Sequence, residues 1–179
     1  MRRLTLFSML LFAGACATTE TGSVRLTEGV RLSSYRRIVV MPFADRSGKG
    51  SAISDEIAKR LFNLRFSVVY GSQLEATLSQ LGVRQGDSIG AQTMRELRRM
   101  TQAEVLLIGS VDCEMRSRSP RANAILMDAS NNRVLFEARF RPEQCGEENV
   151  AEAVATQVVN AMRSTMTENV ESGIAGRGF

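Results

Sequence analysis

The chain has 179 residues, with 23 lysines and arginines, 19 aspartates and glutamates, and no histidine. This length suits one domain of ordinary size, and the lack of histidine excludes Ser-His-Asp and Cys-His catalytic arrangements and histidine-containing zinc sites. Two arginines in the first three residues account for half of the formal charge of +4, so the near-balanced remainder gives no indication of nucleic-acid binding.

The start of the chain has the features of a lipoprotein signal. Two arginines precede an apolar run over 4–12, and Ala-Gly-Ala and Cys16 follow. The run is far shorter than the ~20 residues of a membrane-spanning helix. The Ala-Gly-Ala-Cys ending resembles a bacterial lipobox, which implies a diacylglycerol and a fatty acid bound to Cys16. Ala17, in place of aspartate, implies sorting to the outer membrane. We predict a signal peptide over 1–15; the alternative is an ordinary secretory signal with a chance cysteine.

The segment after Cys16 is polar and has no sustained hydrophobic period. We predict a lipidated N-terminus and flexible tether over 16–35. About 18 tether residues could extend to at most about 60 Å. The domain is predicted over 36–171, and a disordered, glycine-rich tail over 172–179.

The first half of the domain alternates strands and helices. A continuous apolar run over 36–43 is typical of a strand covered on both faces. A helical pattern over 51–63 and a short strand over 65–70 follow. Two further helices are expected over 71–82 and 91–102, the second with Met94 and Leu97 facing inward.

The second half contains a hairpin and a long helix. An apolar strand is expected over 103–115, followed by hairpin strands over 120–129 and 133–140. In the last strand, alternation predicts a single face made of Val134, Phe136, Ala138 and Phe140. A helix over 147–170 completes the order βαβααβββα. The sequence thus predicts one α/β (α+β) domain with helices packed on a mixed sheet.

A glycine- and lysine-containing loop lies between the first strand and helix, as in a nucleotide-binding P-loop. That motif requires G-x-x-x-x-G-K-[ST], with glycines that let backbone amides surround the phosphates. Here Phe43 occupies the first glycine position, and Ser51 comes one residue late after Lys49. The pattern predicts no nucleotide site but a connection in which Ser51 or Ser54 caps the following helix.

Few other residues suggest a site. Cys113 and Cys145 form a possible disulfide in an oxidising compartment, or else two separate thiols. Arg95, Arg98 and Arg99 share one helix face, which is either a solvated surface or a partner-binding face for an acidic patch. We expect no catalytic residue, no metal, and no cofactor besides the lipid on Cys16.

Two longer motifs resemble a known family. One is the strand and loop "RIVVMPFADRSG", with Pro42, Phe43, Asp45, Arg46 and Gly48. The other is "TQAEVLLIGSV", with the Ala103-Glu104 pair before its apolar run. Over about 36–165 the chain resembles the periplasmic family that includes the N-terminal domain of TolB, the curli-export lipoprotein CsgG and the penicillin-binding-protein activator LpoB. The resemblance implies their fold, and a structural rather than phosphate-binding role for the glycine loop.

The resemblance also implies a class of function. We expect a non-enzymatic outer-membrane lipoprotein on the periplasmic face, an accessory or assembly factor of a cell-envelope machine that acts by protein–protein contact, as penicillin-binding-protein activators do. The alternative is a CsgG-like oligomeric secretion component or a flagellar-ring component. The short hairpin, with Arg139 and Arg141 outward, argues against a pore. Expected partners are the membrane and an envelope protein or further copies of the chain, without nucleic acid or nucleotide.

Overall fold

The computed structural model describes residues 22–46, 48–84, 89–113, 121–142 and 149–175. Its strands are β1 (Gly22–Leu26), β2 (Arg37–Val40), β3 (Ala44–Asp45), β4 (Ser67–Val69), β5 (Val105–Asp112), β6 (Arg121–Asp128) and β7 (Val134–Phe140). Its helices are the 3-10 turn η1 (Leu32–Ser34), α1 (Gly50–Asn63), α2 (Gly71–Gln80), α3 (Ala91–Thr101) and α4 (Val150–Ala175). Within these ranges, no helix is long and apolar enough to cross a membrane.

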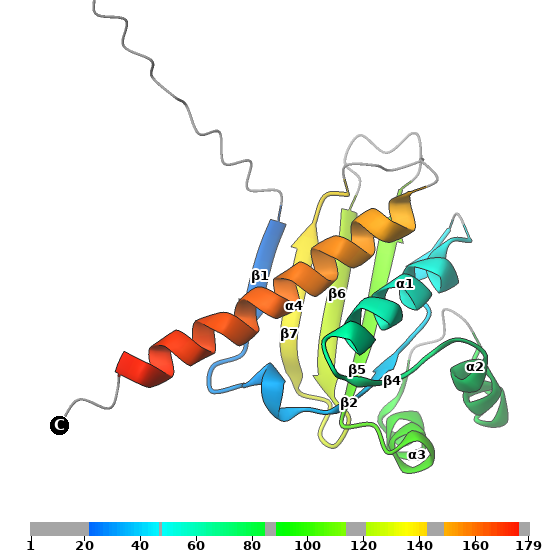
Figure 1. Cartoon of the computed structure of the whole chain (residues 1–179). Helices are drawn as coiled ribbons and strands as arrows, with labels where there is room; N and C mark the ends of the chain where they lie inside the picture. The colour runs from blue at the N-terminus through cyan, green and yellow to red at the C-terminus, as the bar shows by residue number, and fades with distance from the viewer. Residues whose placement is uncertain (1–21, 47, 85–88, 114–120, 143–148, 176–179) are drawn as a thin grey trace, which may run out of the picture.

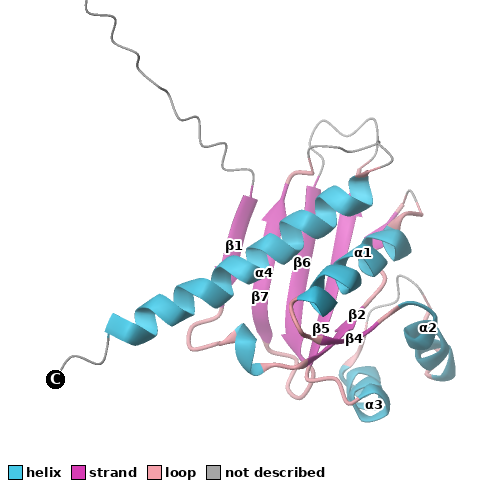
Figure 2. Cartoon of the chain, viewed as in Figure 1, coloured by secondary structure: helices cyan, strands magenta, loops and turns pink. Residues whose placement is uncertain are grey.

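The strands form one mixed sheet, shown in Figures 1 and 2. Its order is β1-β7-β6-β5-β2-β4, and β3 pairs with β5 beside this path. β2 pairs in parallel with β4 and β5, whereas β5, β6, β7 and β1 pair antiparallel. From β2 to α4, the predicted order βαβααβββα is confirmed, with the two-residue β3 as an addition.

Helices cover the two faces of the sheet unequally. On one face, α1 and α4 lie side by side (Figure 1) over the larger core. On the other face, α2 and α3 cover a smaller core with β2, β4 and β5. Val105 and Leu107 of β5 belong to the first core and Leu106 to the second, because successive strand residues face opposite sides. This double covering explains the continuous apolar runs of β2 and β5.

The predicted tether over 16–35 is wrong from residue 22 onward. β1 pairs antiparallel with β7, with Val24 opposite Ala138. After β1, Val30 and Leu32 are buried in the larger core, with exposed fractions of 8% and 1%. A five-residue edge strand is too short to display a period, and its pairing with β7 is not local. The domain therefore includes residues 22–35, which the sequence assigned to the tether.

The carboxyl-terminal boundary also differs from the prediction. α4 begins at Val150 and continues to Ala175, so the predicted tail over 172–179 is helical in its first four residues. The rest of that tail, and the predicted signal peptide, fall outside the described residues.

The β6–β7 hairpin confirms the predicted strands but not their strict alternation. Leu126 pairs with Phe136 and Met127 with Val134, so Leu135 is an extra residue in β7. This β-bulge turns Leu135 into the core, at 2% exposure, and leaves Val134 42% exposed. The predicted face is correct at Phe136 and Ala138 and wrong at Val134, because a bulge reverses the alternation beyond it.

Candidate functional site

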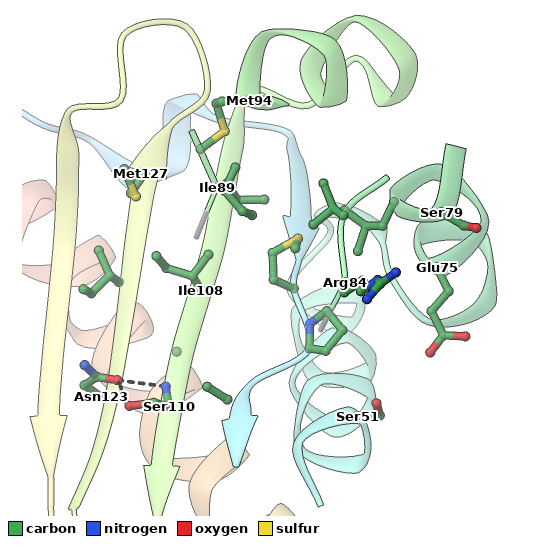
Figure 3. A pocket seen from close by; sticks show the side chains of 18 of the residues that line it. Ser51, Glu75, Ser79, Arg84, Ile89, Met94, Ile108, Ser110, Asn123 and Met127 are labelled. Atoms are coloured by element: carbon green, nitrogen blue, oxygen red, sulfur yellow. Dashed lines mark hydrogen bonds between the residues drawn. The ribbon is translucent and has the colours of Figure 1, made fainter. Parts of the chain in front are cut away.

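A groove of about 870 Å³ is open on the face of the sheet that carries α2 and α3 (Figure 3). The groove exists because α2 and α3 cover only part of that face of the sheet. The smaller core takes sheet residues from β2, β4 and β5 and none from β6 or β7. The groove lies where this cover ends, between the helices and the uncovered strands.

The floor of the groove consists of cross-strand pairs between β5 and β6. Leu106 faces Met127, and Ile108 faces Ile125. Of these four, only Leu106 is fully buried, and the other three are half-buried. Because paired side chains on one face of a sheet lie within contact distance, the floor is a continuous apolar surface. Met41 and Met94 extend it, and their flexible thioether chains suit a surface that adapts to different apolar groups.

The next pair along the floor is polar. Ser110 donates from both its backbone N–H and its hydroxyl to Asn123 Oδ1, each at 2.8 Å (Figure 3). Because the backbone N–H can only donate, it fixes the oxygen of the amide toward β5 and directs the NH₂ group away from it. The apolar floor therefore ends in a hydrogen-bonding group.

The opposite side of the groove is more polar. In Figure 3, Glu75, Ser79 and Arg84 lie on the α2 side, across from Ile108 and Met127. Glu75 of α2 is exposed at the rim of the groove. The groove has an apolar floor, one polar end and a charged rim. It therefore suits an apolar group that is flanked by polar groups.

The loop before α1 is a structural connection. Lys49 N donates to Asp45 Oδ2 at 2.7 Å, so a carboxylate of the chain itself occupies the helix start where a P-loop would hold phosphate. Ser54 Oγ accepts from Phe43 N at 3.0 Å and lies 2.8 Å from Met41 O. The prediction that Ser51 or Ser54 caps α1 is wrong, because the N-cap residue is Lys49, whose side chain makes no capping hydrogen bond, and Ser54 instead holds the chain that enters the helix.

The second family motif also has a structural explanation. The Glu104 carboxylate accepts from the backbone N–H groups of Arg36 and Arg37, the latter at 3.1 Å. It thereby holds the start of β2 beside β5. The neighbouring Tyr35 has a raised pKa, caused first by burial and then by the charge of Asp128, with a smaller contribution from Glu104.

The structure places the predicted site residues apart from the groove or outside the described ranges. Arg95, Arg98 and Arg99 are exposed on α3, and Arg99 pairs with Glu96 at 2.9 Å. Cys113 follows β5 and is disulfide-bonded. Its predicted partner, Cys145, and the predicted lipidation site, Cys16, both fall outside the described residues, so the pairing and the lipidation stay predictions.

The groove itself was not predicted. Its floor depends on the register between β5 and β6, and its depth depends on where α2 and α3 stop covering the sheet. One signal in the sequence pointed to the groove. Ser110 and Asn123 are polar, yet they lie two positions from Ile108 and Ile125 and therefore on the same face of their strands.

No family model and no curated protein matches this chain. Several solved structures do. The PelC dodecamer from Paraburkholderia phytofirmans is 15% identical, with a TM-score of 0.52 over 81% of this chain and 97% of that one. The lipoprotein GNA1162 from Neisseria meningitidis is 18% identical, with a TM-score of 0.54 over 71% and 96%. The LpoB C-terminal domain from Escherichia coli is 20% identical, with a TM-score of 0.50 over 66% and 88%.

This chain has the LpoB/PelC fold. The fold expected from the two sequence motifs is thus confirmed, and it is shared with lipoproteins of the cell envelope. At these identities the likeness concerns the fold alone, because unrelated functions recur on one fold.

Proposed function

We propose that this chain is a non-enzymatic, lipid-anchored protein of the outer membrane that acts through protein–protein contacts, assembling with copies of itself close to the membrane surface. The observation that carries the proposal is the short sequence distance between Cys16 and the sheet. β1 begins six residues after Cys16, so the connection can extend to at most about 20 Å.

A connection this short limits which partners the domain can meet. The tether expected from the sequence alone could have reached about three times as far. A domain held within about 20 Å of its lipid anchor has its most frequent contacts with proteins in the same membrane, including other copies of the chain. The likeness to PelC supports self-assembly, because that structure is a dodecamer and nearly its whole length is matched.

A second candidate function is that of a monomeric adaptor. The exposed arginine face of α3 favours it, together with the likeness to the LpoB C-terminal domain. In that case Arg95 and Arg98 would contact an acidic patch on another envelope protein.

Chemical crosslinking in intact membranes tests the two candidates against each other. Self-assembly predicts a ladder of bands at multiples of the monomer mass. A single band at the mass of the monomer plus a different protein would instead support the adaptor. Cys16→Ser is the matched control: it should move the protein to the soluble fraction after a salt wash and weaken the ladder. A Cys16→Ser protein that stays in the membrane would contradict the lipid anchor.

A further inference from the structure

Phe62 is an apolar side chain that the fold leaves uncovered. It is 70% exposed, the largest exposed fraction among the large apolar residues described, ahead of Val24 at 50% and Val134 at 42%. It stands near the end of α1, directly after Leu61, which is fully buried. Because it points away from the core that α1 covers, no packing within the domain requires an aromatic ring here. Aromatic residues with this exposure are enriched among the anchors of protein–protein contacts.

The groove is the complementary feature. Its floor is apolar, it belongs to the opposite face of the sheet from α1, and three of its four floor residues are half-buried. A volume of about 870 Å³ leaves room for an aromatic side chain and the chain that carries it. The domain thus presents one uncovered apolar ring and one uncovered apolar groove on different faces.

Each feature has one charged residue beside it that could pair with the other across a contact, although Arg84 also lies on the Glu75 side of the groove. Arg65 is exposed three residues after Phe62. Glu75 is exposed at the rim of the groove. An arginine beside the ring and a carboxylate beside the groove would attract each other across a contact and help to orient it.

We propose that Phe62 of one copy inserts into the groove of the next copy, with Arg65 facing Glu75. Because the Phe62 side chain and the groove lie on different faces, the contact is head to tail. Each copy inserts its own Phe62 into one neighbour and receives the Phe62 of another. Contacts of this kind build a closed ring when the rotation between copies closes, and a filament when it does not. The inference rests on the proposed self-assembly and names the contact that carries it.

The test uses the full lipidated chain in mild detergent and measures the mass of the particles. Phe62→Ser removes the ring, and Met127→Arg places a charge on the groove floor while leaving Phe62 in place. Each variant alone should lose the large assembly, with dissociation constants raised about tenfold or more. Mixed together, the two variants retain one intact ring and one intact groove, so they should form a 1:1 dimer and nothing larger. Val24→Ser, which removes an exposed apolar side chain of β1 away from the groove, should assemble as wild type.

A second pair of variants tests the contact without disturbing the groove floor. Arg65→Glu and Glu75→Arg should each weaken assembly, and the double variant should restore it. An assembly that persists in folded Phe62→Ser protein would overturn this contact while leaving self-assembly standing. A wild-type protein that is monomeric at every concentration would overturn both the contact and the proposed self-assembly.

Discussion

Among the described glycines, Gly50 is the one at which an added Cβ atom would meet the nearest neighbour. A Cβ atom added there would lie 1.9 Å from the backbone oxygen of Phe43, so α1 or the strand before it would have to move. We expect Gly50→Ala to destabilise the domain by about 3 kcal/mol, in the range of other backbone clashes and core strain. Gly90→Ala is the control, because nothing lies within 4 Å of an added Cβ there; it should cost well under half as much. Urea unfolding of both variants measures the difference.

The raised pKa of Tyr35 predicts a loss of stability at alkaline pH. Burial is the first cause that raises its pKa above the ordinary value of 10.0. In the unfolded chain the phenol therefore loses its proton at a lower pH than in the folded domain. The contribution of the protonated Tyr35 phenol to the free energy of unfolding is fully present below pH 10. It is lost as the pH rises from the pKa of the unfolded chain to the pKa of the folded domain. Tyr35→Phe should flatten the fall of unfolding free energy above pH 10; an unchanged slope would contradict this assignment.

At the scale of elements, the segment before β2 belongs to the fold rather than to a tether. Leu32 is 1% exposed in the larger core. Leu32→Ala should therefore cost about 2 to 5 kcal/mol, as buried leucines do. Val24→Ala, at an exposed position of β1, should change stability by less than about 1 kcal/mol. Equal, small effects at both positions would mean that residues 22–35 do not pack on the domain.

The disulfide is a further prediction about elements. If Cys113 is bonded to Cys145, the bond ties the end of β5 to the segment that precedes α4. The closed loop should contribute about 3 to 4 kcal/mol by restricting the unfolded chain. Thiol counting on denatured, unreduced protein should find neither cysteine reactive. Reduction should lower the melting temperature, and two reactive thiols in the unreduced protein would exclude the bond.

The elements that could be predicted from sequence are those with a local pattern. The stripe of Ile53, Ile57 and Leu61 repeats with the period of a helix, and all three are fully buried in α1. β1 could not be predicted, because its five residues are stabilised by pairing with a strand more than a hundred positions away. The bulge at Leu135 and the floor of the groove depend on strand register, which local alternation does not determine.

At the scale of the whole molecule, the placement of β1 changes the functional interpretation. A long tether would allow a domain to work far from its membrane, whereas only five residues separate Cys16 from β1, so the proposed lipid anchor would hold the domain close. With that anchor, the uncovered Phe62 and the groove would lie on a domain whose neighbours share its membrane. These features together favour an assembly of identical copies.

The most direct measurement is the mass of the lipidated protein, extracted in mild detergent and weighed particle by particle over a range of concentrations. We predict a stable particle of many copies with a narrow mass distribution, because a head-to-tail contact that closes gives a defined number of copies. A monomer at all concentrations would contradict self-assembly and leave the adaptor as the better account.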